Sequence, residues 1–85
     1  MRILYSSKFG KNYRKLPIDV KKKAEKCETI FRKNPYDSRL KTHKLKGVFY
    51  DYYAFSINFQ YRIIFEFKEG GVVWFHSVGT HEIYD

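Results

Sequence analysis

Four residues of this chain have types and positions that suit acid–base chemistry: His43, Arg62, His81 and Tyr84. His43 lies in a lysine-rich segment just before a predicted sheet, and Arg62 lies in the middle strand of that sheet. His81 and Tyr84 follow the last predicted strand. In a three-strand meander, the start of the first strand, the middle strand and the tail can meet on one sheet face.

Two imidazoles, a guanidinium and a phenol suit RNA cleavage by attack of a ribose 2′-OH on the neighbouring phosphate. One group removes the hydroxyl proton, a second protonates the leaving 5′-oxygen, and a cation stabilises the charge on the phosphate. Histidine titrates near neutral pH, and arginine holds phosphate in a bidentate fork. Each histidine also has a structural interpretation: His43 as a surface loop residue, His81 as part of a polar tail, and His76 as a satisfied strand residue. We adopt the structural interpretation for His76.

Metal-dependent and thiol chemistry are disfavoured. The three histidines have no clustered carboxylates beside them, so we expect no metal site and no cofactor. The single Cys27 excludes an internal disulfide, and its place on an apolar helix stripe predicts a core residue rather than a nucleophile. A phosphate-binding glycine loop, an HExxH motif and a nucleophile elbow are all absent from the sequence.

Length, charge and hydropathy favour a small cytosolic protein that binds a polyanion. A chain of 85 residues predicts one domain, covering residues 1–85. Residues 1–46 hold 15 of the 17 basic residues and 4 of the 9 acidic ones, and most of the net charge of +8 therefore lies there. Such a basic surface fits nucleic acid or an acidic protein, although a solvated basic helix without a partner is the alternative. No apolar run approaches the ~20 residues that span a bilayer, and no signal-peptide pattern opens the chain.

Two helices are predicted in the first half of the chain. Ser6 or Ser7 offers an N-cap for the first, in which an apolar stripe is formed by Phe9, Tyr13 and Leu16. The second covers Ile18 to Lys33 and places Val20, Ala24, Cys27 and Phe31 on one apolar stripe. Asn34-Pro35 ends this helix, because proline disfavours helical backbone in the preceding residue.

Four strands complete the expected architecture. Residues 2–5 form a short first strand, and residues 34–47 form a polar, basic loop. The later strands are expected at residues 48–57, 60–67 and 72–78, with a hairpin turn at residues 68–71. The order β-α-α-β-β-β predicts a compact α+β domain, with two N-terminal helices packed on one face of an antiparallel sheet. The first strand is expected to join that sheet.

Three segments resemble the toxins of the RelE/ParE superfamily, and most nearly their YafQ- and YoeB-like branches. They are residues 34–47, the strand segment Tyr61-Arg62-Ile63-Ile64-Phe65, and the ending Val78 to Tyr84. They occur in the family's order and cover essentially the whole chain. The resemblance implies the toxin component of a type II toxin–antitoxin system, bound by a cognate antitoxin with an acidic segment. RelE-like members enter the ribosome and cut mRNA there without a cofactor.

The resemblance also implies roles for individual residues. His43 matches a catalytic histidine or glutamate, Arg62 the phosphate-contacting arginine, and His81 the C-terminal catalytic histidine. Tyr84 falls near a terminal aromatic residue that orients the substrate. The residues expected to dock on mRNA or ribosomal RNA are Lys22, Lys23, Lys41, Lys44 and Lys46.

The chain departs from the family pattern in its strands. Ser56 and Gln60 stand where YafQ-like toxins place a further histidine and aspartate, and Tyr53 and Phe55 stand near the strand lysines of RelE. The base and the acid are therefore not assigned between His43 and His81. Two alternatives follow: a ParE-type toxin that acts on DNA gyrase without nuclease activity, and a degenerate member that only binds its antitoxin or RNA.

Overall fold

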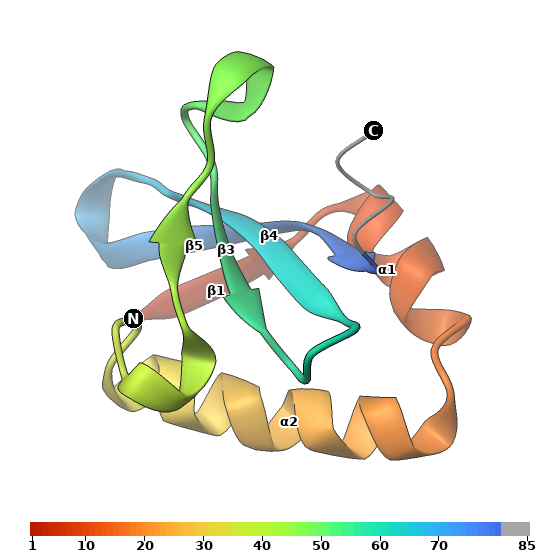
Figure 1. Cartoon of the computed structure of the whole chain (residues 1–85). Coiled ribbons are helices and arrows are strands. Elements are labelled where there is room, and N and C mark those ends of the chain that lie inside the picture. The colour runs from red at the N-terminus through yellow and green to blue at the C-terminus, as the bar shows by residue number, and fades with distance from the viewer. Residues whose placement is uncertain (81–85) are drawn as a thin grey trace.

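The computed structural model describes residues 1–80 of the chain. Two helices and five strands follow one another as shown in Figure 1, with bounds β1 Arg2–Tyr5, α1 Ser7–Arg14, α2 Ile18–Lys33, β2 His43–Lys44, β3 Tyr53–Ser56, β4 Arg62–Phe67 and β5 Val72–Gly79. Short 3-10 helices cover Ser38–Leu40, Gly47–Phe49 and Glu69–Gly71. The predicted α+β class and the order of the main elements are confirmed.

The sheet is mixed, with strand order β1-β5-β4-β3-β2. β5 comes last in sequence but pairs in parallel with β1 and antiparallel with β4, so it lies inside the sheet. The predicted antiparallel meander is β3-β4-β5. Two details differ from the expectation: β1 joins in parallel, and the segment predicted as a loop contributes the edge strand β2, which pairs with β3.

The helix boundaries follow local chemistry. The Ser6 hydroxyl caps α1 by accepting a hydrogen bond from the Phe9 amide at 2.9 Å, and it donates to the His76 carbonyl at 2.5 Å. α2 begins after Pro17 and ends before Asn34, with Asp19 in its first turn, where the helix dipole favours an acidic residue. The predicted limits of α2 are confirmed.

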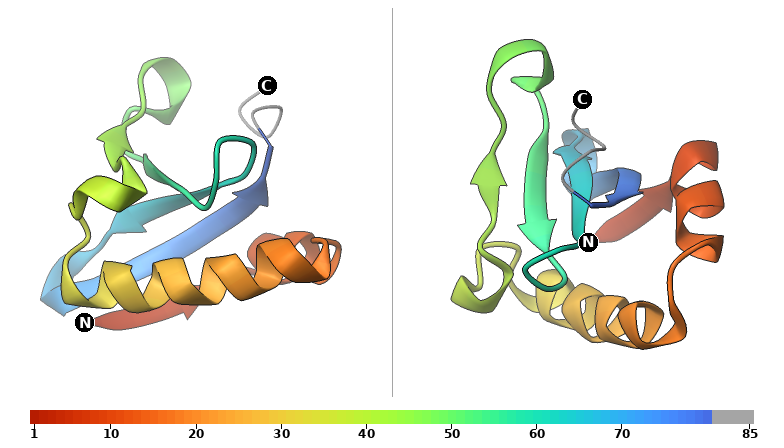
Figure 2. Two further views of the ribbon diagram at one scale, coloured as in Figure 1. Left: turned by 60° about the horizontal axis from the view of Figure 1, so that its bottom comes forward. Right: turned by 45° about the vertical axis from the view of Figure 1, so that its right-hand side comes forward.

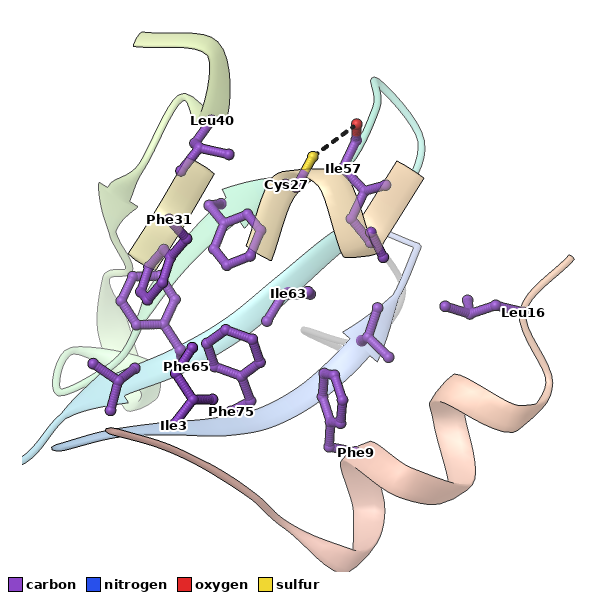
Figure 3. Packing of buried hydrophobic residues seen from close by; sticks show 14 of the residues in the cluster. Ile3, Phe9, Leu16, Cys27, Phe31, Leu40, Ile57, Ile63, Phe65 and Phe75 are labelled. Atoms are coloured by element: carbon purple, nitrogen blue, oxygen red, sulfur yellow. Dashed lines mark hydrogen bonds between the residues drawn. The ribbon is translucent and has the colours of Figure 1, made fainter. Parts of the chain in front are cut away.

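Both helices pack on the same side of the sheet, as Figure 2 shows for α2. The ring of Phe75 in β5 lies 5.5 Å from that of Phe9 in α1 and 5.5 Å from that of Phe31 in α2. Because one strand residue points to one face, both helices must cover that face. Figure 3 shows these rings in a single core with Phe65 and Ile63. We call this the inner face and the opposite side the outer face.

The helix stripes predicted from the sequence are buried, except that Tyr13 of α1 is only half-buried. The four residues of the α2 stripe and Phe9 of α1 are all buried, and Leu16 is buried just beyond the end of α1. The Cys27 thiol faces the carbonyl oxygen of Ile57 at 3.8 Å (Figure 3) and that of Ser56 at 3.9 Å. Cys27 is a buried core residue, and its burial raises the pKa of the thiol.

The aromatic segment predicted as a strand over residues 48–57 folds differently in its first half. Gly47 has a φ of 70°, and the Tyr50 amide donates to the Gly47 carbonyl at 3.1 Å, so the chain turns there. The Leu45 amide then donates to the Tyr52 carbonyl at 2.9 Å and closes a hairpin between β2 and β3. The strand therefore begins only at Tyr53.

Candidate active site

His43 opens β2 and pairs with Ala54 of β3. The side chain is exposed, and its Nδ1 lies 3.0 Å from the carbonyl oxygen of Lys41, a residue held in the left-handed region with a φ of 53°. A carbonyl only accepts hydrogen bonds, so Nδ1 carries the proton in this contact. In the neutral ring, Nε2 then carries the lone pair, and this nitrogen can accept a proton from a ligand.

Arg62 opens β4 and shares the outer face with His43. It pairs with Ser56 of β3 on one side and with Gly79 of β5 on the other. Ser56 lies two residues from Ala54, the partner of His43, and residues two apart on a strand point to the same face. The two strands β4 and β2 are separated by β3, which sets their backbones roughly 10 Å apart. The Arg62 side chain is partly buried.

His81 and Tyr84 lie outside the residues that the structure describes. The last described strand, β5, ends at Gly79, directly beside Arg62 in the sheet register. The predicted roles of His81 and Tyr84 therefore stay predictions.

His76 is an outer-face residue to which the sequence analysis gave no chemical role. Phe65 pairs with Phe75 and Ile64 pairs with Ser77, so His76 is the extra residue of a β-bulge in β5. Its ring lies 5.1 Å from that of Tyr52 and 5.8 Å from that of Trp74. These ring contacts fit the structural interpretation of His76 as a packed strand residue.

The surroundings of His76 disfavour its protonated form. Its Nδ1 lies 3.1 Å from the Ser77 hydroxyl oxygen. Burial lowers the pKa of His76, nearby Lys8 lowers it further, and Glu66 opposes the shift. The sequence indicates this bulge only through the adjacent polar residues His76 and Ser77, which interrupt the alternation of apolar and polar residues in the strand.

The strand residues that depart from the family pattern divide between the two faces. Ser56 lies on the outer face beside Arg62, and Gln60 is exposed in the turn between β3 and β4. Tyr53 and Phe55 belong to the inner face, where their rings contact Phe65 at 5.7 and 5.8 Å. These two aromatic residues are therefore part of the core packing.

The basic residues predicted to contact RNA are exposed and form two groups. Lys41, Lys44 and Lys46 surround β2, whereas Lys22 and Lys23 lie on α2, on the other side of the sheet. Lys23 and Lys41 nevertheless line one groove between α2 and the segment before β2. Within residues 1–80, no group of three or more His, Cys, Asp or Glu residues could hold a metal ion. No helix in that part of the chain has both the length and the apolar character to cross a membrane.

Neither a family model nor a curated protein sequence matches this chain. Solved structures do match it. YafQ from E. coli strain BL21(DE3) has 21% sequence identity and a TM-score of 0.81, with 99% of this chain and 98% of YafQ covered. A YoeB/ParE toxin from Agrobacterium tumefaciens has 15% identity and a TM-score of 0.80, with 95% and 99% covered.

A third match is the E. coli DinJ-YafQ toxin-antitoxin complex, at 20% identity and a TM-score of 0.72, with 95% of this chain and 92% of the matched chain covered. Each match extends over almost the full length of this chain and of the matched chain, so the similarity concerns the whole fold rather than one motif. This chain therefore has the fold of the YafQ and YoeB/ParE toxins, as its resemblance to the RelE/ParE superfamily implied.

Proposed function

We propose that this protein is the toxin of a type II toxin–antitoxin system and cuts mRNA on the ribosome. The observation that carries the proposal is the placement of His43 and Arg62 on one sheet face of a YafQ-like fold. His43 offers a proton-accepting nitrogen and Arg62 a permanent positive charge. Both groups are needed for cleavage of a phosphodiester.

The proposed reaction is an internal transfer followed by strand release. A histidine takes the proton from the ribose 2′-OH, and the oxygen attacks the adjacent phosphorus atom. The bond from phosphorus to the 5′-oxygen breaks, and that oxygen receives a proton from the acid. The products are a 2′,3′-cyclic phosphate and a free 5′-OH. Arg62 holds the phosphate oxygens and stabilises their charge in the transition state.

Two assignments complete the proposed site. His81 is the second proton-transfer group, and which of His43 and His81 acts as base is left open; Tyr84 orients the substrate. His76 is a third histidine, on the face that holds Arg62, and burial lowers its pKa. It is a further candidate for proton transfer in a chain that has serine at position 56.

Charge supports the proposed partners. The net charge of +8 suits mRNA and ribosomal RNA. Five exposed lysines would contact their phosphates without reading sequence: Lys22, Lys23, Lys41, Lys44 and Lys46. The same charge suits a cognate antitoxin with an acidic segment. The YafQ chain in the DinJ-YafQ toxin-antitoxin complex has this fold, which supports a similar partner here.

A cell-free translation assay tests the cleavage. An mRNA is translated with wild-type protein, with His81→Ala and without protein, and new 5′ ends are mapped by primer extension. We expect cuts with wild-type protein only when ribosomes are translating, and none with His81→Ala. Absence of ribosome-dependent cuts with wild type would refute the proposed activity, and gyrase-linked DNA breaks would favour the ParE-type alternative. Equal cutting by His81→Ala would refute the role of His81 alone.

Expression in cells tests the toxin assignment separately. We expect the protein alone to arrest growth and co-expression with the adjacent gene of its operon to restore it. High-level expression without a growth defect would contradict the toxin role, whatever the RNA assay shows.

A further inference from the structure

A basic groove lies between α2, the segment that precedes β2 and the turn between β3 and β4. Its volume is about 520 Å³, within the range of typical ligand pockets. Four basic residues line it: Lys23 and Lys26 from α2, and Arg39 and Lys41 from the segment before β2. Phe59 belongs to the lining from the β3–β4 turn, and Cys27, Ile30, Leu40 and Ile57 give the groove an apolar floor. We call this the Phe59 groove.

The Phe59 groove carries a net positive charge. Its lining contains no aspartate or glutamate. Asp37 forms an ion pair with Arg39 at 2.9 Å from outside the lining, so the charge of Arg39 is largely offset. The three lysines are exposed and supply the net charge, which suits successive phosphates of a polyanion.

Phe59 is a large apolar side chain that the fold holds in solvent, with 84% of its surface exposed. The Asn58 side-chain oxygen accepts hydrogen bonds from the amides of Gln60 and Tyr61, each at 2.8 Å. The Ile57 amide donates to the Tyr61 carbonyl at 2.9 Å. These hydrogen bonds hold the backbone of the turn, which presents the exposed ring of Phe59 beside the groove.

The groove and the proposed active site share one residue, at the end of β3. Ser56 contributes to the groove and is the direct β3 partner of Arg62. Because Ser56 is the last residue of β3, an RNA strand with a phosphate on Arg62 would have to pass this end of β3 to reach the groove on the α2 side of the sheet.

We propose that the Phe59 groove binds single-stranded RNA, with one base stacked on Phe59 and the flanking phosphates on Lys23, Lys26 and Lys41. An exposed ring beside a track of cations is the arrangement by which proteins hold single strands without reading sequence. An acidic peptide would use the lysines but would gain little from a solvent-exposed ring. The proposal rests on the proposed function for the identity of the RNA as mRNA, although the binding itself requires no cleavage.

Binding of a short fluorescent 2′-O-methyl RNA strand, measured by anisotropy, tests the ring. This probe lacks the free 2′-OH and is not cut by the proposed reaction. We expect Phe59→Leu to weaken binding about tenfold and Phe59→Trp to retain it, because stacking contributes about 1–3 kcal/mol per base. Thermal denaturation of both variants should match wild type, since the side chain is exposed. Equal affinity of Phe59→Leu and wild type would overturn the proposal.

The salt dependence of the same binding tests the lysines. We expect Lys23→Gln with Lys26→Gln to reduce the slope of log affinity against log salt by about 1.4, because each phosphate of a single strand that a lysine neutralises contributes ~0.7 to that slope. The matched control, Lys11→Gln with Lys33→Gln, removes the same charge at exposed sites outside the groove. A control that lowers the slope equally would overturn the proposal. So would a probe of poly-glutamate that binds more tightly than RNA and is sensitive to Phe59→Leu.

The two proposals fail separately. Ribosome-dependent cutting by wild type together with unchanged RNA binding by Phe59→Leu would refute the groove and leave the activity intact. RNA binding that depends on Phe59 in a protein that cuts no mRNA would support the groove and refute the activity.

Discussion

Replacement of Phe31 by alanine should remove the packing that joins α2 to the sheet. The Phe31 side chain is fully buried, and its ring lies 5.0 Å from Phe55, 4.9 Å from Phe65 and 5.5 Å from Phe75. These partners belong to β3, β4 and β5, the strands that also present Ser56, Arg62 and His76 on the outer face. Stability and site geometry therefore depend on the same packing.

The expected loss of stability is large for a chain of this size. A buried Phe→Ala change costs about 3–5 kcal/mol. The three neighbouring rings place Phe31 in the upper part of that range, so we expect a loss of about 4 kcal/mol. A chain of 85 residues has a total stability of roughly 4–13 kcal/mol. At ~4–8 °C for each kcal/mol, the melting temperature should fall by about 15–30 °C.

Urea and thermal denaturation followed by circular dichroism measure the effect. Phe59→Ala is the matched control, because the same atoms are removed from a side chain that is 84% exposed. We expect the control to change the free energy of unfolding by less than about 0.5 kcal/mol. A loss below about 2 kcal/mol for Phe31→Ala, or equal losses for both variants, would refute this description of the core.

Three further outcomes follow from the backbone and from titrating groups. Gly70→Ala should destabilise the protein by about 1 kcal/mol, because φ is 72° at this position. Gly10→Ala in α1 should stabilise it by about 0.5–1 kcal/mol, because an added Cβ meets nothing within 4 Å. Urea denaturation measures both changes. Cys27 should react with a thiol reagent at least about tenfold faster in urea than in the native state, because burial raises its pKa; equal rates would place it at the surface. Burial and the nearby Lys8 lower the pKa of His76 in the folded state, and Glu66 opposes this shift. The contribution of His76 to the free energy of unfolding should therefore be complete above pH 6.5 and should be lost as the pH falls through the lowered pKa. His76→Gln should flatten this acid-side decline of the urea midpoint, and an unchanged decline would contradict the assignment.

The helices and the β4–β5 hairpin could be predicted because local signals and packing agree there. The apolar stripe of α2, the stop at Asn34-Pro35 and the glycines at 70 and 71 each favour the structure that is present. The Lys68 amide donates to the Val72 carbonyl at 2.8 Å and closes the predicted turn. Such segments can be predicted from sequence because the local conformational preference of their residues agrees with the tertiary packing.

The segment from His43 to Tyr53 was harder to predict because its structure depends on pairing between distant residues. A run rich in tyrosine and phenylalanine favours a strand, but Gly47 adopts positive φ and the chain turns before β3 begins. The two-residue strand β2 exists only through its pairing with β3. Neither the parallel pairing of β1 with β5 nor this edge strand leaves a periodic pattern.

The candidate site was predictable in its residues and only partly in its geometry. Strand alternation correctly sets the direction of Arg62, and the structure places His43 on the same face through β2. The alternation fails at His76, where one extra residue places two successive side chains on the outer face. The Phe59 groove had no signal in the sequence, because its residues come from three separate segments.

The most direct test of the account compares the cutting of ribosome-bound mRNA by wild-type protein and by Arg62→Ala under single-turnover conditions. Loss of the cation that stabilises the phosphate should slow cleavage by about 10²–10³-fold. The wild-type fragments should carry a 2′,3′-cyclic phosphate and a 5′-OH. An Arg62→Ala variant that folds normally and cuts at the wild-type rate, or fragments that end in a 5′-phosphate, would contradict the proposed chemistry on the outer face.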